Sequence, residues 1–550
     1  MGGSWGAYLK FAGFDAVIIK GHAEKPVYLY IHDSICETKD AQDIWGLDAV
    51  STRQVLKSEL GRQARVLAIG PAGEKQISFA SILADYDASG SCGFGAVMGS
   101  KNLKAIVVNG KNGLKPAKPD RLKQLIKFLQ AVKRADIEQP PATAANIKAK
   151  RKACFGCISG CTRSLLRSSD SRQGKYLCTS GFFYEDWAKK YYGELNEVPF
   201  LATRLCDAYG LDANVIYTML SWLSKCYKSG VLTEYETGLP LSKIGSIEFI
   251  EKIVDMISHR EGFGEVLALG LPQAADRLGP EVKRLVPDTV FKDGSDTAYC
   301  PRVYLTNALI FPFESRQSFP ISGEVGRTVL RWLDWLAEKK VSTSSVEKTM
   351  FLGGRSISQS DLQFIARHFW GSEEAADLTS VKGKALAAKR IQDRHYAKES
   401  AILCNFAWHV TAIEIVKPSI IAEILSAVIG TYYDEDEVYH LGERVFNQQR
   451  AILVRERGKG REEDTLPLIW YDIPVSEAFM NENLVVPGPN GQPVSRKGCT
   501  IDEEQFESLK DEYYKLRGWN KMNGLQTKKR LSLLGLSDVA EDLAKLNLVQ

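Results

Sequence analysis

The feature of the sequence that most constrains the fold is a run of three cysteines, Cys154, Cys157 and Cys161. Gly156 and Gly160 lie between them and let the backbone turn tightly, as thiolates around an iron–sulfur cluster require. Three cysteines cannot complete a four-thiolate site, so we expect a distant fourth. A four-cysteine zinc site also begins with C-x2-C, but the chain has no second C-x2-C pair, and this favours the cluster.

The composition indicates a large globular protein. With 550 residues, of which 44% are hydrophobic and 25% charged, about two to four domains are expected. A net charge of +4 is small for this length and argues against a nucleic-acid partner. We expect neither a membrane span nor a signal peptide. Eleven cysteines are too sparse for a disulfide framework, and together with the cysteine run they predict a reducing cytoplasm.

The hydrophobic pattern changes from strands to helices along the chain. It predicts strands at 16–19, 26–31, 65–69 and 105–110, with a helix at 54–61 between the second and third of them. A linker follows and contains one amphipathic helix, 121–134. Later helices are predicted at 198–209, 213–229, 246–260, 329–339, 385–397, 419–429 and 435–455.

A glycine-rich stretch at 89–104 has two interpretations. Four glycines fall within eleven positions, so backbone N–H groups could approach a phosphate or a pterin closely. The alternative is a bulged, glycine-rich connection between strands. The stretch alone leaves both interpretations open.

Several short motifs together carry a resemblance to a known family. They are Lys10-Phe11-Ala12-Gly13-Phe14-Asp15-Ala16, Gly70-Pro71-Ala72-Gly73-Glu74, the segment 95–106, the three cysteines, Asp207-Ala208-Tyr209-Gly210-Leu211-Asp212, Leu403-Cys404, and the segment 513–519. In this order the chain resembles the aldehyde:ferredoxin oxidoreductase family, whose members are tungsten bis-pterin enzymes. The matches extend from the first residues to about Trp519.

The resemblance implies an α+β fold. We expect the remainder of a β-rich, pterin-binding N-terminal domain at 1–115, a helical domain at 116–292 and a helical C-terminal domain at 293–550. The family has a further stretch before the Gly-Gly-x-x-Gly segment that here spans Gly2 to Gly6. We therefore expect the pterin-binding domain to be incomplete, with matching coding sequence upstream or in a separate polypeptide.

The resemblance also implies the metal ligands. Cys154, Cys157 and Cys161 match the first three ligands of a [4Fe-4S] cluster, and Cys404 matches the fourth. The cofactors expected are therefore this cluster and a tungsten, or molybdenum, bis-pterin.

Two motifs of the family bind pterin. Asp207, Gly210 and Asp212 match the first, and a carboxylate suits the N–H donors on a pterin edge. Gly210 and Asp212 would also simply end one helix and cap the next. The second motif is matched by Glu399 and Leu403, where the family has an aspartate in place of Glu399.

The expected catalytic residue is Glu185, which matches a family glutamate near the metal and would act as a general acid or base. A plain surface glutamate is the alternative. The family's aldehyde enzymes have a histidine after Tyr-x-Thr-Asn, whereas Tyr304-Leu305-Thr306-Asn307 is followed by Phe311, Pro312 and Phe313. These apolar residues predict a pocket for an aryl group.

Other polar residues near these segments also have expected roles. Cys300 is interpreted as a core residue rather than a metal ligand, and His395 and His409 as structural. Arg302 and Arg316 are candidates for contacts to coenzyme A phosphates.

We therefore expect a tungsten–pterin, iron–sulfur oxidoreductase acting on the aldehyde or oxo group of its substrate. The alternatives are the catalytic subunit of a tungsten-dependent benzoyl-CoA reductase and a non-catalytic electron-relay subunit. Expected partners are ferredoxin or an iron–sulfur electron-transfer subunit, an aldehyde or aryl-CoA substrate, and further copies of the chain in an oligomer.

Overall fold

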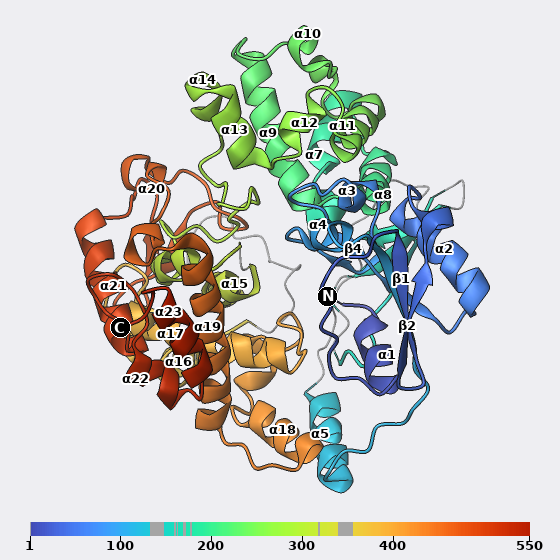
Figure 1. Cartoon of the computed structure of the whole chain (residues 1–550). Helices are drawn as coiled ribbons and strands as arrows, with labels where there is room; N and C mark the ends of the chain where they lie inside the picture. Colours follow the sequence, from blue (N-terminus) through green and yellow to red (C-terminus); the bar gives the residue numbers. More distant parts are fainter. Residues whose placement is uncertain are drawn as a thin grey trace. The chain divides into compact units, whose positions relative to one another are not determined.

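A computed structural model describes residues 2–132, 148–158, 161, 163–168, 172–176, 179–316, 319–338 and 356–550. The chain forms two compact units, shown in Figure 1. The first contains residues 1–114 and 138–296, and the second contains 115–137 and 297–550. Within the described ranges, no helix is both long and apolar enough to cross a bilayer.

The first unit is built on a six-stranded mixed sheet. Its strands, in spatial order, are β2 (Ile35–Asp40), β1 (Val27–His32), β6 (Leu103–Asn109), β3 (Arg65–Ala68), β4 (Ile82–Leu83) and β5 (Ser89–Gly90). Strands β1 and β6 are parallel, with Ile31 opposite Val108, and the other neighbouring pairs are antiparallel. The predicted strands at 26–31, 65–69 and 105–110 are confirmed.

Side chains of the central strands alternate between two hydrophobic clusters. Leu67 and Val108 belong to one cluster, and Val66 and Val107 belong to the other. Because successive residues of a strand point to opposite faces, the sheet is covered on both faces. Helix α1 (Trp5–Phe11) contributes to the first cluster and α2 (Ala49–Leu60) to the second.

Glycines allow two short helices beside the sheet to pack closely. These are α3 (Pro71–Glu74) and α4 (Phe94–Gly99). A Cβ atom on Gly99 would collide with the carbonyl oxygen of Gly73, and one on Gly95 would lie 2.7 Å from the oxygen of Ser81. Backbone packing therefore explains two glycines of the 89–104 stretch, while a role of this stretch in binding stays a prediction.

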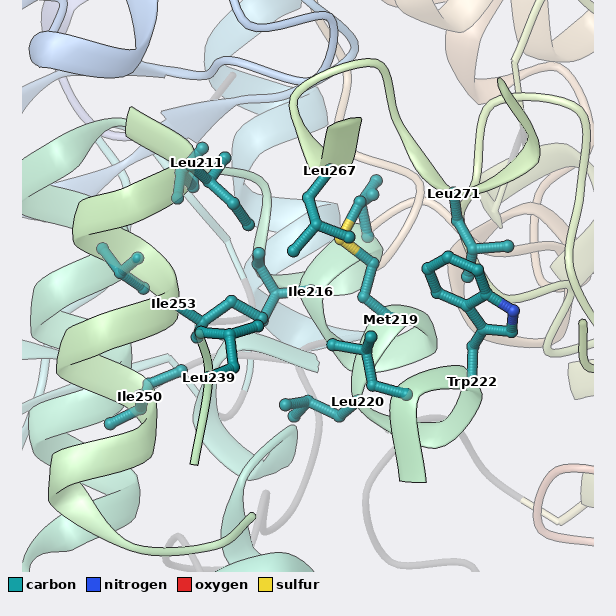
Figure 2. Packing of buried hydrophobic residues seen from close by; sticks show 14 of the residues in the cluster. Leu211, Ile216, Met219, Leu220, Trp222, Leu239, Ile250, Ile253, Leu267 and Leu271 are labelled. Carbon is teal, nitrogen blue, oxygen red and sulfur yellow. The ribbon is translucent and has the colours of Figure 1, made fainter. Parts of the chain in front are cut away.

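A helical layer completes the first unit. Its helices are α6 (Thr179–Phe182), α7 (Glu185–Tyr192), α8 (Val198–Tyr209), α9 (Ala213–Lys228), α10 (Glu234–Thr237), α11 (Ile247–His259), α12 (Gly264–Leu267), α13 (Leu271–Leu278) and α14 (Pro280–Lys283). Figure 2 shows part of the core of this layer, in which Met219 and Leu220 of α9 lie between Ile250 and Ile253 of α11 on one side and Trp222 and Leu271 on the other.

The junction of α8 and α9 has the structure that the sequence predicts. Gly210 ends α8 in the left-handed conformation, with φ of 82°. The carboxylate of Asp212 then caps α9 by accepting a hydrogen bond of 3.0 Å from the backbone N–H of Asn214. The junction is therefore rigid and has a polar edge.

A small antiparallel sheet carries the cysteine run. It consists of β7 (Lys148–Arg151), β8 (Ser164–Arg167) and β9 (Gln173–Tyr176). The cysteines lie on the connection from β7 to β8, and β9 packs against α8.

The second unit is mainly helical. It contains α5 (Pro119–Ala131), α15 (Phe319–Glu338), α16 (Gln359–Phe369), α17 (Lys384–Ser400), α18 (Ile420–Ile429), α19 (Glu435–Arg457), α20 (Ile469–Asp472), α21 (Glu503–Arg517), α22 (Lys528–Leu533) and α23 (Ser537–Lys545), with a hairpin of β10 (Val485–Pro487) and β11 (Pro493–Ser495). Helices α17 and α19 approach so closely that a Cβ atom on Gly442 would collide with the carbonyl oxygen of Asp393. The seven helices predicted after the cysteine run are all present, and the one at 329–339 is part of the longer α15.

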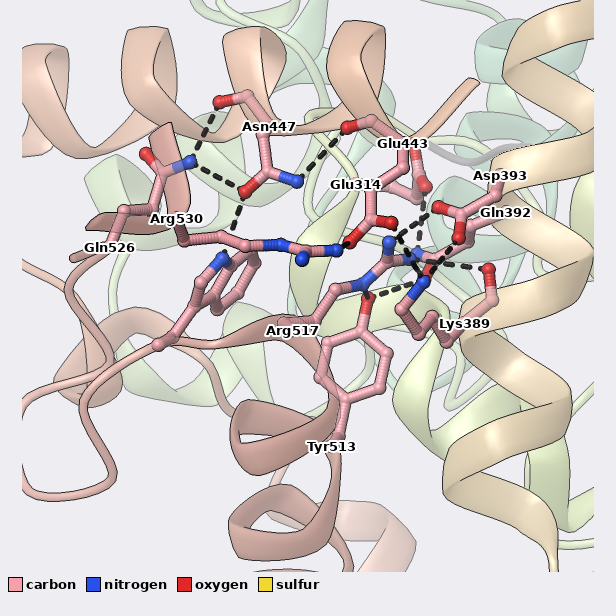
Figure 3. Close-up of polar contacts among 11 residues, drawn as sticks. Glu314, Lys389, Gln392, Asp393, Glu443, Asn447, Tyr513, Arg517, Gln526 and Arg530 are labelled. Carbon is pink, nitrogen blue, oxygen red and sulfur yellow. Dashed lines mark hydrogen bonds and ion pairs between the residues drawn. The ribbon is translucent and has the colours of Figure 1, made fainter. Parts of the chain in front are cut away.

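A buried polar network joins α21 to α17 and α19 (Figure 3). The guanidinium of Arg517 pairs with Asp393 and donates to Gln392 at 3.0 Å. Lys389 bridges Asp393 at 2.8 Å and Glu443 at 3.0 Å. The 513–519 motif thus includes a residue that holds the helices of this unit together.

One predicted strand is wrong. Residues 16–19 form no strand, although Val17 and Ile19 pack against the sheet core and Ile18 is exposed. The alternation of apolar side chains is that of a strand, but the segment makes no ladder with the described strands, and a strand requires one.

Candidate functional site

The three clustered cysteines lie on a tight turn. The backbone N–H of Cys157 donates to the carbonyl of Cys154 at 3.2 Å, and Gly156 has a φ of 66°. Cys154, Cys157 and Cys161 are all half-buried. In the part of the chain that the structure describes, no three Cys, His, Asp or Glu side chains converge as metal ligands. Cys404 belongs to the second unit and is exposed there. The four-cysteine ligand set therefore stays a prediction.

A cavity of about 220 Å³ lies in the first unit beside Cys154. Its walls come from the N-terminal segment, the β4–β5 region, the small sheet and the junction of α8 and α9. The lining residues are Gly2, Ser81, Asp87, Ala88, Ser89, Ser91, Cys154, Arg163, Lys175, Ser180, Asp207, Leu211, Asp212, Ala213 and Asn214. Two of the three residues of the predicted pterin motif, Asp207 and Asp212, are therefore in one cavity with a predicted cluster ligand.

The two carboxylate oxygens of Asp207 differ in their hydrogen bonding among the described residues. Its Oδ1 lies 2.7 Å from the ammonium of Lys175, whose Nζ also donates to Ser89 at 2.9 Å. Its Oδ2 is buried and has no hydrogen-bond partner among the described residues. Burial raises the pKa of Asp207, and Lys175 offsets only part of this effect. A buried acceptor without a partner is costly, so this oxygen fits a ligand that brings an N–H donor.

A neighbouring carboxylate, Asp87, is held ionised. It pairs with Arg53 and, at 3.0 Å, with Arg204. Burial pushes the pKa of Asp87 upward, but the two guanidinium groups outweigh burial and hold it below its ordinary value. The cavity wall therefore combines one firmly ionised carboxylate with one that is less firmly ionised.

Asp212 lines the cavity at the helix junction, whereas Gly210 is not among the lining residues and packs against Gly70. A Cβ atom on Gly70 would collide with the backbone of Ala208 and Tyr209, so the loop after β3 packs directly on the end of α8. Burial raises the pKa of Asp212, although its carboxylate caps α9. The capping role is therefore observed, and pterin binding by this residue stays a prediction.

The N-terminal segment closes the cavity near the cysteine turn. The backbone N–H of Phe155 donates to the carbonyl of Gly3 at 2.9 Å. A Cβ atom on Gly2 would lie 2.8 Å from the sulfur of Cys154. Ser4 donates to the buried Asp85 at 3.3 Å. A side chain at position 2 would therefore crowd the thiol of Cys154.

Glu185 lies beside the main cavity rather than in it. It begins α7 and lines a separate space of about 10 Å³, enough for one water. Tyr176 donates to its carboxylate at 3.5 Å, and burial raises the pKa of Glu185. Lys175 lines both spaces. The raised pKa suits an acid–base role, and the plain surface alternative does not describe this half-buried side chain.

The second predicted pterin motif lies at the end of α17 in the second unit. Glu399 is exposed in the last turn, and Leu403 is half-buried. Ile402 has a φ of 57°, in the left-handed region that suits glycine. The backbone at Ile402 is thus in a conformation that glycine adopts without steric cost.

A buried charged cluster occupies the interior of the second unit. Glu324 accepts from His395 at 2.7 Å and Trp370 at 3.0 Å and pairs with Arg394. Burial lowers the pKa of His395 to about 3. The structural interpretation of this histidine therefore agrees with its surroundings. His409, also buried and with its pKa lowered by burial, hydrogen-bonds Thr411 at 2.8 Å.

The prediction that Phe311 and Phe313 line a pocket for an aryl group is wrong. Phe313 is fully buried, stacks on Tyr513 with ring centres 4.6 Å apart and touches Trp519 edge-on. Phe311 packs against Trp470. Both rings belong to the aromatic core of the second unit and present no face to a substrate.

The structure also shows how far Cys300, Arg302 and Arg316 are buried. Cys300 is buried, as expected of a core residue, and accepts from Nε of Arg302 at 3.3 Å. Arg302 is itself buried and donates to the carbonyl of Ile473 at 2.7 Å. Because it is buried, Arg302 does not fit the expected role of binding a coenzyme A phosphate at the entrance of a substrate pocket. Arg316 is partly exposed.

Sequence reasoning missed two residues of the cavity, Lys175 and Arg163. Neither belongs to a motif. Lys175 stands on β9 in a polar stretch, and the packing of β9 against α8 brings it beside Asp207. The signal that could have found Arg163 is its position two residues after Cys161.

Comparisons with known proteins identify the family of this chain. The family model described as aldehyde ferredoxin oxidoreductase, N-terminal domain, matches residues 1–110, and the model for domains 2 and 3 matches 125–536. The tungsten-containing aldehyde ferredoxin oxidoreductases of Pyrococcus furiosus and Pyrococcus abyssi are each 28% identical to this chain, covering 98% of it and 84% of the relative.

A solved structure is similar in fold. It is described as the active site complex BamBC of benzoyl coenzyme A reductase in complex with 1,5-dienoyl-CoA. The match has a TM-score of 0.69 and 20% identity, and it covers 99% of this chain and 85% of the other.

Proposed function

The chain belongs to the aldehyde ferredoxin oxidoreductase family, and from that premise we propose what its residues do. It is an oxidoreductase with a tungsten bis-pterin and a [4Fe-4S] cluster. The observation that carries this function is that Oδ2 of Asp207, which has no hydrogen-bond partner among the described residues, lies in a cavity that also reaches Cys154. A carboxylate oxygen accepts the N–H donors of a pterin edge.

The cavity residues have distinct roles in this proposal. When bound, the metal–pterin group exchanges electron pairs with the substrate, and the cluster passes electrons one at a time. Asp207 holds the pterin edge, and Lys175 keeps the second oxygen of that carboxylate fixed. Asp212 and Gly210 supply the rigid rim at the helix junction. Glu399 and Leu403 offer a second contact from the end of α17.

Glu185 is the proposed acid–base residue. Its pKa is raised by burial, so that it gives up a proton nearer to neutral pH than an exposed glutamate does. The proposed ligands of the cluster are Cys154, Cys157, Cys161 and Cys404. The proposed domain boundaries lie near residues 115 and 292.

The proposed reaction is oxidation of an aldehyde with water to a carboxylic acid, which releases two protons and two electrons. The electrons pass to a ferredoxin, as the names of the relatives state for those proteins. A second candidate is reduction of an aryl-CoA thioester. One sequence observation favours it, since no histidine follows Tyr304-Leu305-Thr306-Asn307 before Phe319. The solved neighbour, similar in fold, was captured with a dienoyl-CoA.

An anaerobic turnover assay separates the two candidates. The purified holoenzyme is mixed with ferredoxin or a viologen dye and with either small aldehydes or benzoyl-CoA-like thioesters. Aldehyde-dependent dye reduction supports the first candidate. Thioester-dependent oxidation of a strong low-potential donor supports the second. Absence of both activities in protein that contains tungsten and iron would contradict the proposed function.

A further inference from the structure

We propose that Arg163 is a positioning residue that hydrogen-bonds the Cys154 ligand of the cluster and sets the cluster's reduction potential. This inference rests on the proposed function, because it takes Cys154 as a ligand. It adds a residue that belongs to none of the motifs through which the chain resembles its family.

Arg163 is held in place by three neighbours. Its side chain is buried, with 2% of the residue exposed. One terminal nitrogen donates to the sulfur of Cys154 at 3.4 Å, and the other donates to the backbone carbonyl of Tyr86. The next residue, Ser164, begins β8 and pairs with β7. The guanidinium is therefore fixed between the cysteine turn and the loop before β5.

Among the residues that the structure describes, no carboxylate balances the charge of Arg163. In the described ranges no Asp or Glu lies within ion-pair distance of it, although the cavity contains acidic groups. Asp87 is engaged by Arg53 and Arg204, and Asp207 is engaged by Lys175. A buried charge without a partner is strongly unfavourable, and arginine does not lose its proton in proteins. An anionic thiolate cluster beside Cys154 would supply the missing negative charge.

The guanidinium also faces the cavity. Arg163 lines the same space as Asp207, and its Nε is buried without a partner among the described residues. The side chain of Arg163 therefore both donates to the sulfur of Cys154 and lines the cavity beside it.

The expected consequence is electrostatic. Reduction adds negative charge to the cluster, and a hydrogen bond with a positive charge at a ligand sulfur stabilises the reduced form. Arg163 should therefore raise the reduction potential. A purely structural arginine, which only ties the cysteine turn to Tyr86, would leave the potential unchanged once the protein has folded.

The test is an anaerobic redox titration of the cluster followed by low-temperature EPR. The variants are Arg163→Met, which removes the charge and the donors, and Arg163→Lys, which keeps the charge with fewer donors in reach. Arg167→Met is the matched control, because Arg167 is exposed on the same strand, β8. Iron content and circular dichroism show that each protein is folded and loaded.

We expect the midpoint potential to shift to more negative values in Arg163→Met and by a smaller amount in Arg163→Lys, with no shift in Arg167→Met. If Arg163→Met loses its cluster, the midpoint potential of the Arg163→Lys protein is used to test the inference. An unchanged potential in a loaded Arg163 variant, or loss of the cluster from both variants, would overturn the inference and leave the proposed function standing. A wild-type protein that holds no cluster would overturn both.

Discussion

The ammonium of Lys175 lies 2.7 Å from Oδ1 of Asp207, and the two side chains are only 5% and 6% exposed. Removing one member of a buried pair leaves the other charge without compensation, which typically costs about 3 kcal/mol. Lys175→Met should therefore lower the free energy of unfolding by about that amount, as measured by urea denaturation. The exposed Lys189→Met is the control. Equal stability of Lys175→Met and the wild type would show that the pair is not coupled.

Ile402 should be replaceable by glycine with a gain in stability. A β-branched residue at a φ of 57° is strained, and relief of about 1–2 kcal/mol exceeds the extra entropy that glycine loses on folding, about 0.5–1 kcal/mol. We expect Ile402→Gly to raise the denaturation midpoint. Ile35→Gly, in strand β2, should lower it, because Ile35 has ordinary strand geometry. A lower midpoint for Ile402→Gly would contradict the assignment of strain.

The free energy of unfolding should fall as the solution becomes acidic, over a pH range that is set by the buried His395. In the unfolded chain a histidine binds a proton below about pH 6.5, whereas His395 in the folded chain, with a pKa of about 3, does not. Because the unfolded state then binds more protons, the free energy of unfolding decreases as the pH falls from 6.5 toward 3, and His395 alone contributes at most about 1.4 kcal/mol per pH unit to this decrease.

His395→Gln should reduce the slope of the free energy of unfolding against pH between pH 6.5 and 5. The slope is measured by denaturation at a series of pH values. Part of the slope should remain, since burial also lowers the pKa of His409. The exposed His22→Gln should leave the slope as it is in the wild type. Equal slopes for His395→Gln and His22→Gln would be evidence against a neutral buried His395.

Cys404 should be required for a normal cluster. Loss of one thiolate ligand alters the electronic structure of a [4Fe-4S] centre. We therefore expect Cys404→Ser to have less iron and a changed low-temperature EPR spectrum, while Cys36→Ser, at an exposed cysteine of β2, should match the wild type. An unchanged spectrum would exclude Cys404 as a ligand.

The parts of the fold that the sequence predicts correctly depend on local signals. Gly210 and Asp212 mark the junction of α8 and α9, because a left-handed C-cap and an Asx N-cap are decided within a few residues. Strand β6 was predicted because Ala105 to Val108 form an apolar run, which is typical of a strand buried on both faces. Such features need no knowledge of the tertiary structure.

The parts that it does not predict depend on distant partners. Val17 and Ile19 have the alternation of a strand, but only a neighbouring strand could have made them one. Phe313 is apolar, as a substrate pocket would require, yet it packs against Tyr513, 200 residues later in the chain. Lys175 reaches Asp207 only because β9 packs beside α8.

The central claim is that the cavity beside Cys154 holds a metal–pterin group through Asp207, and metal analysis tests it most directly. Tungsten, molybdenum and iron are measured in anaerobically purified wild type, Asp207→Asn, and Asp255→Asn, an exposed control on α11. An asparagine can turn a donor N–H2 toward the pterin edge, where the carboxylate only accepts. We predict iron and tungsten in the wild type and in Asp255→Asn, and iron with much less tungsten in Asp207→Asn. Wild-type protein that contains iron but neither tungsten nor molybdenum, or an Asp207→Asn protein with full tungsten, would contradict the account.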